Sequence, residues 1–225
     1  MSERHEGWNE YYERHAERQP RQQLLDALDL MRERHDSFCD LIALDVGAGQ
    51  MTETKALLEA GLGRVIATDF SEGAERAAAK LELQYNDFSR DIERLSFHRL
   101  AHEELANALA PESVDLIVSY YALPFTRTNA FEPLWQSLRA ALKPDGILSV
   151  NLFGMHDTWA QERMVGGVLQ ASGMTFHTRE ELDALCDGMT DVSIIEREYD
   201  GSTTAGESKH WHTFDIQAVA SSHHS

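Results

Sequence analysis

Short apolar runs alternate with helix-like stretches along most of the chain, and this alternation constrains the fold more than any other feature. Strands are predicted for the apolar runs at 41–46, 64–70, 94–100, 114–123 and 146–153. Helical periodicity is found in the stretches 52–63, 71–83, 101–109, 129–142 and 178–186. Strands that alternate with helices form a mostly parallel sheet with helices on both faces, so the predicted fold class is α/β.

The two ends of the chain depart from this alternation. Residues 191–200 and 210–220 predict two final strands with no helix between them, so we expect an antiparallel hairpin that completes a seven-stranded sheet. At the other end, residues 8–35 predict two helices or one helix interrupted at Pro20. The expected organisation is an N-terminal helical cap segment (1–38), a main domain (39–220) and a disordered tail (221–225).

Charge and hydropathy exclude several classes of partner. The formal net charge of −18 disfavours nucleic acid, because phosphate contacts depend on lysine and arginine. No apolar run approaches the length of a membrane span, and the polar N-terminus has no signal-peptide pattern, so we expect a cytoplasmic protein that does not bind membranes. Cys39 and Cys186 lie far apart and predict reduced thiols, with no metal site and no disulfide. No signal in the sequence indicates the oligomeric state.

The first predicted strand ends in an acidic residue followed by a glycine turn, LDVGAG. In an open parallel sheet, ligands bind at the carboxyl ends of the strands, where this turn would lie. A dinucleotide fingerprint needs a third glycine, and this chain has Thr52 in that place. A carboxylate at Asp45 favours a ligand that carries an ammonium or sulfonium and opposes a pyrophosphate. The turn therefore predicts a cofactor with positive charge.

A second acid, Asp69, ends the next strand about twenty residues after the glycines, where a carboxylate can accept both hydroxyls of a ribose. The structural alternative is that Asp45 caps its turn and Asp69 caps the following helix, with no ligand bound. The occurrence of both acids at this spacing favours a nucleoside cofactor.

Taken in order, these motifs resemble those of the class I S-adenosylmethionine-dependent methyltransferases. LDVGAGQ is similar to the first motif of that family, ATDFS to the second, VDLIVSYYAL to the fourth-strand motif, and ALKPDGILSV to the turn and strand that follow. The resemblance covers nearly the whole chain and implies a Rossmann-like fold, S-adenosylmethionine as cofactor and S-adenosylhomocysteine as product. The segments WNEYY and EREYDGSTTAGESKHWHTFDIQAVA are most similar to small-molecule methyltransferases of the tellurite-resistance type.

The resemblance also implies roles for individual residues. Asp45 and Gly47 would hold the methionine end of the cofactor, Asp69 the ribose, and Phe70 would pack on adenine. The adenine amino group would meet His102, Glu103 or the backbone of Ala101 and His102. The full set of expected cofactor residues is Asp45, Gly47, Ala48, Gly49, Asp69, Phe70, Ala101, His102, Ser119 and Tyr120.

The sequence departs from the family pattern at two places. Gln50 and Met51 follow the turn where the family usually has another glycine, so bulk is placed beside the methionine end of the cofactor. After the third strand, where the family commonly has an acid, this chain has the run Leu100-Ala101-His102-Glu103.

Residues after the fourth and fifth strands are the candidates for catalysis and acceptor binding. The catalytic candidates are Tyr120, Tyr121 and His156. Further candidates for acceptor contact are Phe125, Asp157 and Trp159, with Trp8, Tyr11 and Tyr12 as a lid. His210 and His212 share one strand face with Phe214 and Ile216, and two hydrogen-bonded histidines are a more frequent finding there than a metal pair.

The predicted function is methyl transfer from S-adenosylmethionine to a small-molecule acceptor by in-line displacement. This reaction needs alignment and exclusion of water rather than a catalytic triad. Two alternatives remain at this stage: a nicotinamide-dependent oxidoreductase, supported by GAGQMT alone, and a non-catalytic protein of the same fold that binds a partner protein. The sequence defines neither the acceptor nor which of its atoms is methylated.

Overall fold

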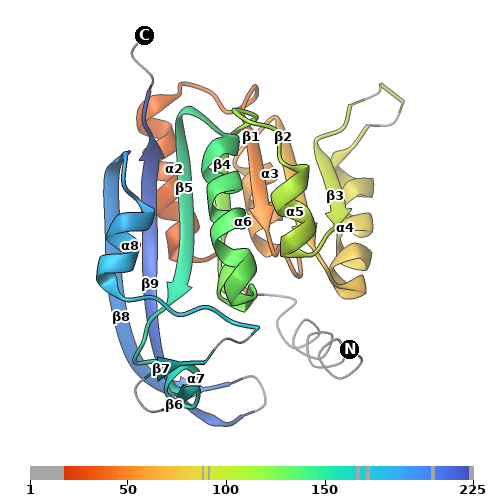
Figure 1. Cartoon of the computed structure of the whole chain (residues 1–225). Coiled ribbons are helices and arrows are strands. Elements are labelled where there is room, and N and C mark those ends of the chain that lie inside the picture. The colour runs from red at the N-terminus through yellow and green to blue at the C-terminus, as the bar shows by residue number, and fades with distance from the viewer. Residues whose placement is uncertain are drawn as a thin grey trace.

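The computed structural model describes residues 18–87, 89–90, 92–165, 168–170, 173–203 and 206–222. Within these residues the chain forms a seven-stranded sheet of order β3-β2-β1-β4-β5-β9-β8, flanked by helices (Figure 1). The strands from β1 to β5 run parallel, whereas β9 pairs antiparallel with β5 and with β8. The predicted α/β class, the mostly parallel sheet and the C-terminal antiparallel hairpin are confirmed.

The strands of this sheet are β1 (Ile42–Val46), β2 (Arg64–Asp69), β3 (Leu95–Arg99), β4 (Val114–Ser119), β5 (Leu142–Phe153), β8 (Met189–Ser202) and β9 (Ser208–Ala220). A separate two-stranded sheet joins β6 (Met164–Val165) to β7 (Val168–Leu169). The helices are α2 (Gln22–Arg34), α3 (Thr52–Glu59), α4 (Glu72–Tyr85), α5 (His102–Ala108), α6 (Thr128–Ala141), α7 (Thr158–Gln161), α8 (Arg179–Leu185) and the 3-10 turn η1 (Leu123–Phe125).

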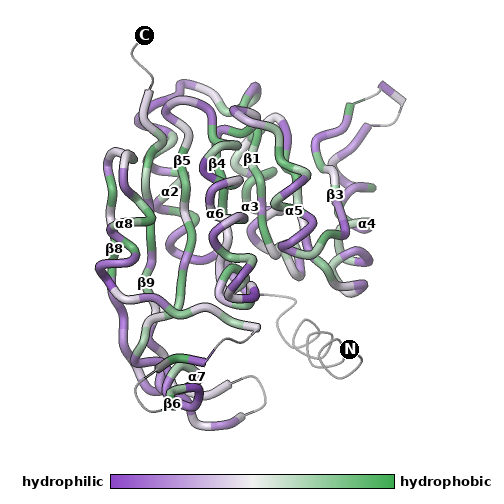
Figure 2. The backbone as a smooth tube through the Cα atoms, viewed as in Figure 1, coloured by the Kyte–Doolittle hydropathy of each residue, from purple (hydrophilic) through white to green (hydrophobic). Residues whose placement is uncertain are grey.

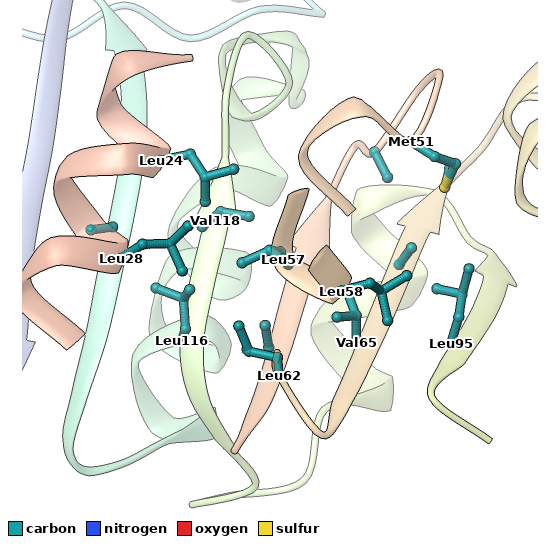
Figure 3. Packing of buried hydrophobic residues seen from close by; sticks show 14 of the residues in the cluster. Leu24, Leu28, Met51, Leu57, Leu58, Leu62, Val65, Leu95, Leu116 and Val118 are labelled. Carbon is teal, nitrogen blue, oxygen red and sulfur yellow. The ribbon is translucent and has the colours of Figure 1, made fainter. Parts of the chain in front are cut away.

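Each face of the sheet has its own hydrophobic core, because side chains alternate along a strand. In β4, Leu116 and Val118 pack with leucines of α2 and α3, while Ile117 points to the opposite face. Figure 3 shows Leu24 and Leu28 of α2 directed toward these two β4 residues. The helices α5, α6 and α8 cover the other face. Figure 2 shows hydrophobic stretches in the central strands and alternating hydropathy along the helices.

Some elements differ from the predictions. The proposed turn at 143–146 lies within β5, which begins at Leu142, and Asp145 there has a φ of 65° beside a shift in the β4–β5 register. The fourth strand ends at Ser119, earlier than predicted. Helix α7 and the pair β6–β7 are absent from the prediction because two- to four-residue elements carry too little periodicity to detect.

The edge that contains the carboxyl ends of the parallel strands carries most of the predicted site. The β8–β9 hairpin extends beyond this edge, and α7 and β6–β7 lie beside it (Figure 1). The proposed lid residues Trp8, Tyr11 and Tyr12 lie outside the described residues. No helix in the described part of the chain is long and apolar enough to span a bilayer.

Candidate functional site

The glycine turn after β1 has a backbone that few other residues can adopt. Gly47 and Gly49 have φ values of 73° and 52°, in the left-handed region, and Met51 follows with a φ of 62° before α3 begins. A Cβ atom on Gly47 would lie 2.2 Å from Cβ of Ala122, the residue that follows the end of β4 by three positions. The turn therefore packs so closely against the segment after β4 that a side chain at Gly47 would overlap Ala122.

The amide groups of this turn are already used inside the protein. The N–H groups of Gly47 and Ala48 donate to the Thr68 carbonyl oxygen at 2.8 and 3.0 Å, and Gly49 N–H donates to Asp69 Oδ2 at 3.0 Å. A phosphate-binding turn instead points free N–H groups at its ligand. These three amides are thus unavailable for phosphate, which agrees with a turn that does not bind a dinucleotide.

Acidic side chains surround the turn. Asp45 is buried and accepts a hydrogen bond from the Thr54 hydroxyl at 2.6 Å. Glu53, also buried, is bound by the Arg18 guanidinium, with Nη1 at 2.6 Å from Oε1. Burial and, to a smaller extent, the nearby Glu53 carboxylate raise the pKa of Asp45 from 3.8 to about 7. A cation bound beside Asp45 would stabilise its ionised form.

The carboxylate of Asp69 is held in a fixed orientation at the end of β2. Its Oδ2 accepts the Gly49 N–H, and its Oδ1 accepts the Ser71 N–H at 2.8 Å. Phe70, the next residue, is 37% exposed at the same edge. Asp69 and Phe70, the residues predicted to contact ribose and adenine, thus lie at the carboxyl end of β2.

The region after β3 narrows the choice of adenine contacts. The N–H of Ala101 donates to Glu104 Oε2 at 2.8 Å, and its carbonyl accepts the N–H groups of Glu104 and Leu105. The His102 ring contacts Thr126 Oγ1 through Nδ1 at 2.7 Å, and burial lowers the pKa of this histidine. The backbone of Ala101 is therefore already engaged, whereas His102 and Glu103 stand in the first turn of α5, where N–H groups have no partner within the helix.

The end of β4 holds three of the predicted residues in different environments. The Ser119 hydroxyl donates to the Val46 carbonyl at 2.9 Å and ties β4 to β1. The Tyr120 hydroxyl lies in the core, 2.8 Å from Ser149 Oγ. Tyr121 has a φ of 58°, and its N–H donates to Asn151 Oδ1 at 2.6 Å. Burial raises the pKa of both tyrosines above the usual range, so neither acts as a base near neutral pH.

Tyr121 belongs to an aromatic cluster beyond the strand ends. Its ring packs edge-on against Phe153 and Trp211, and its hydroxyl lies 3.3 Å from that of Tyr199. Two of the acceptor-contact candidates, Phe125 and Trp159, pack against Phe153 in the same cluster. The structure therefore brings Tyr121, Phe125 and Trp159 together.

A buried ion pair lies against these rings. Lys209 Nζ donates to Asp157 and lies 4.0 Å from the ring centroid of Trp159 and 4.3 Å from that of Trp211. Asp157 also caps α7 by accepting the Trp159 N–H at 2.9 Å. Its fully buried carboxylate is thereby occupied in holding α7 to β9.

His156 is separated from the tyrosines by the sheet. Its ring stacks on His212 and contacts Glu198 Oε1 at 3.0 Å, whereas Tyr121 contacts Trp211, whose side chain points to the other face of β9. The three catalytic candidates thus do not meet at one point. His210 is bonded to Asp200 at 2.8 Å, and His212 to Glu196 at 2.9 Å.

His156, Glu198 and His212 lie close enough for a metal ion, but the protonation of His212 opposes this. Its Nδ1 accepts the backbone N–H of His156 at 3.0 Å, so the proton of the neutral ring is on Nε2, the atom that faces the carboxylates. A metal-bound histidine has the reverse arrangement, with its second nitrogen donating to an acceptor. The cluster is therefore explained by hydrogen bonds among its own members.

Sequence reasoning missed several polar residues of the site. Thr54 stands in the first turn of the helix that the glycine turn opens, and its position there was a usable signal. Asn151 is an amide within an otherwise apolar strand, which was a second signal. Arg18, by contrast, reaches Glu53 across thirty-five residues, and no local pattern indicates that contact.

Comparisons with known proteins agree with this geometry. A family of methyltransferase domains matches residues 44–150, from β1 to the middle of β5. No curated protein matches the chain. Among solved structures, the chain is similar to TehB from Haemophilus influenzae at 13% identity, with a TM-score of 0.63 over 89% of this chain and 62% of the other.

Two further structures are similar over most of their length. The 1,6-didemethyltoxoflavin-N1-methyltransferase of Burkholderia thailandensis, solved with its substrate and S-adenosylhomocysteine, has 19% identity and a TM-score of 0.57, covering 89% of this chain and 79% of that one. A SAM-dependent methyltransferase from Methanosarcina mazei has 18% identity and a TM-score of 0.59, covering 86% and 97%. Residues 44–150 thus match a family model of methyltransferase domains, and the chain has the fold of class I methyltransferases.

Proposed function

We propose that this chain, a methyltransferase of class I fold, binds S-adenosylmethionine at the Gly47–Gly49 turn and methylates a small-molecule acceptor beside Tyr121. The observation that supports this most strongly is the charge around the turn. Asp45, Glu53 and Asp69 lie close together there, and among the described residues Arg18 is the cation that interacts with them. An excess of negative charge favours a cofactor that carries a sulfonium and an ammonium.

The residues around the turn fit this cofactor in shape as well as in charge. A side chain at Gly47 would overlap that of Ala122, so the absence of Cβ lets the turn pack closely against the segment that follows β4. Asp69 would hold the ribose hydroxyls, and Phe70 would cover the adenine. Asp45 would face the charged methionine end from the opposite side.

The cofactor supplies a methyl group already activated for displacement. The protein's part is then to align the acceptor with the methyl group and to exclude water. Ser119 fixes the β4 end against β1, and the Asn151 amide fixes the backbone of Tyr121. Tyr120, Tyr121 and His156 stay predictions as catalytic residues, and the raised pKa of the two tyrosines favours a positioning role for them.

A small acceptor is favoured over a nucleic acid by the formal charge of −18. The nicotinamide alternative is disfavoured because the amides of Gly47, Ala48 and Gly49 already donate within the protein.

Isothermal titration calorimetry with S-adenosylhomocysteine tests the cofactor assignment. We expect saturable binding that Asp69→Ala weakens about tenfold or more, because charge-assisted hydrogen bonds to the ribose would be lost. Asp183→Ala, which removes an exposed carboxylate paired with Arg179 on α8, is the matched control and should bind normally. Absence of binding to the wild-type protein would refute the proposal.

Acceptor class is tested by a panel of small oxygen, nitrogen, thiol and oxyanion nucleophiles, with release of S-adenosylhomocysteine as the readout. Turnover of any member supports enzymatic methyl transfer. Tight cofactor binding with no turnover across the panel and across cell-extract metabolites would instead support the non-catalytic alternative.

A further inference from the structure

The side-chain amide of Asn151 is fully buried and only half satisfied. Its Oδ1 accepts the backbone N–H of Tyr121 at 2.6 Å, and since that N–H can only donate, the identity of the two amide atoms is fixed. Among the described residues, Nδ2 has no hydrogen-bond partner. A buried amide donor without a partner is unfavourable, so this group indicates a missing acceptor.

A second donor without a partner lies beside the same tyrosine. The Arg21 guanidinium packs on the Tyr121 ring, with Cζ 4.2 Å from the centroid. Its Nε is buried, and no described residue accepts a hydrogen bond from it. The start of α2 is placed there because Ser149 Oγ, two residues before Asn151 on β5, donates to the Gln23 carbonyl at 3.4 Å. The two unpartnered donors therefore belong to residues that both contact Tyr121.

Arg21 brings a positive charge to this place. Asp215 lies opposite Asn151 in the β5–β9 register, but its Oδ2 is paired with Arg197 Nε at 2.6 Å. No ion pair joins the Arg21 side chain to a carboxylate within the described part of the chain. Among the described residues, the Arg21 charge thus lacks a counter-ion, while that of Asp215 has one.

We propose that Arg21 and Asn151 form a subsite for a carboxylate carried by the methyl acceptor, so that the acceptor is a small organic acid. The proposal rests on the proposed function above. A carboxylate supplies acceptor oxygens for both donors and balances the arginine charge, whereas a neutral amide would balance nothing. Tyr121 follows β4 next to Ala122, whose side chain meets the Gly47 turn, so the subsite lies on the acceptor side of the expected cofactor position.

Formate and formamide serve as probes because they differ in charge. Both are small enough to enter the subsite whatever the rest of the acceptor is. We would follow the side-chain NMR signals of Asn151 and Arg21 in protein saturated with S-adenosylhomocysteine. The expected result is a saturable shift of both signals with formate and none with formamide. Shifts of equal size with both probes, or formate shifts that never saturate, would overturn the subsite.

Substitutions test the same point. Asn151→Asp retains an acceptor for the Tyr121 N–H but removes the free donor, and Arg21→Gln removes the charge. Each substitution should weaken formate binding about tenfold or more. Binding of S-adenosylhomocysteine should be retained, and this retained binding shows that the variant folds. Arg32→Gln, an exposed change on the same helix, should leave formate binding unaltered. Normal formate binding in both site variants would contradict the proposal.

The competing ligand for this subsite is the carboxylate at the methionine end of the cofactor itself. Titration with S-adenosylhomocysteine distinguishes this carboxylate from one carried by the acceptor. If S-adenosylhomocysteine itself shifts the Asn151 and Arg21 signals and blocks formate, the subsite belongs to the cofactor and the acceptor assignment is wrong. If the protein binds formate but never binds S-adenosylhomocysteine, the proposed function fails while the anion subsite stands.

Discussion

Thr54 donates its hydroxyl hydrogen to Asp45 at 2.6 Å, and so joins the helix after the glycine turn to the strand before it. The bond fixes a buried carboxyl group whose pKa is raised to about 7, first by burial and then by Glu53. This arrangement makes both folding and cofactor binding depend on pH, in opposite directions.

The free energy of unfolding should fall as pH rises from about 4 to about 7. In that window the unfolded chain has released the Asp45 proton while the folded protein retains it, so folding becomes less favourable as pH rises. The decrease in the free energy of unfolding levels off above the folded pKa. The full change is up to about 4 kcal/mol. Urea titrations across this range measure it, and Asp45→Asn should remove the slope. An unchanged slope in that variant would contradict the assignment.

S-adenosylhomocysteine should bind more tightly as pH rises through the same range. In the proposed site its ammonium would pair with ionised Asp45, so below the folded pKa of about 7 each unit of pH should change the affinity by about tenfold. Calorimetry at a series of pH values measures this, with Asp45→Asn as the variant in which the dependence disappears. Affinity that is independent of pH in the wild-type protein would show that Asp45 does not face the ammonium.

Gly47→Ala should impair both folding and cofactor binding. The φ of 73° costs an alanine about 1–2 kcal/mol, and its Cβ would overlap Cβ of Ala122. Adding Ala122→Gly removes the overlap but not the backbone strain, so the double variant should recover only part of the loss. Urea unfolding of the single and double variants checks this, and full recovery would show that the backbone conformation is unimportant.

Local pattern predicted the parts of the fold and site that depend on local chemistry. Asp45, the glycines and Asp69 are recognisable because each is defined by its position at the end of an apolar run. The contact of Asn151 with Tyr121, and that of Arg18 with Glu53, join residues thirty and thirty-five positions apart. Such contacts depend on strand order and on where α2 packs, which periodicity does not encode.

The positions of Lys209 and His156 also depend on contacts between distant segments, so local pattern does not predict them. A lysine in a polar segment is expected at the surface, yet Lys209 is buried because the hairpin brings it against Asp157 and two tryptophans. His156 follows β5 as predicted, but the Gly154 backbone packs directly on the His212 ring and directs this segment toward the other face of the sheet from Tyr121. Only tertiary packing decides these placements.

Ser71→Ala should destabilise α4 without altering the sheet. Ser71 Oγ accepts the Ala74 N–H at 3.1 Å and so caps α4, and loss of such a cap costs about 1 kcal/mol. For a chain of this size the melting temperature should fall by about 2–4 °C. Ser71→Asp retains a capping oxygen and should melt close to the wild-type protein. Equal melting temperatures for the alanine and aspartate variants would argue against capping.

Lys209→Met should destabilise the protein by about 3–5 kcal/mol, because it leaves Asp157 charged and buried without its partner. Asp157→Asn removes the charge while an amide oxygen still caps α7. In the double variant the buried charge is gone from both sides, and methionine can pack against Trp159 and Trp211. The double variant should therefore lose less stability than the sum of the two single losses, by about 0.5–3 kcal/mol. Urea unfolding of all four proteins completes the cycle, and strictly additive losses would show that the two charges do not interact.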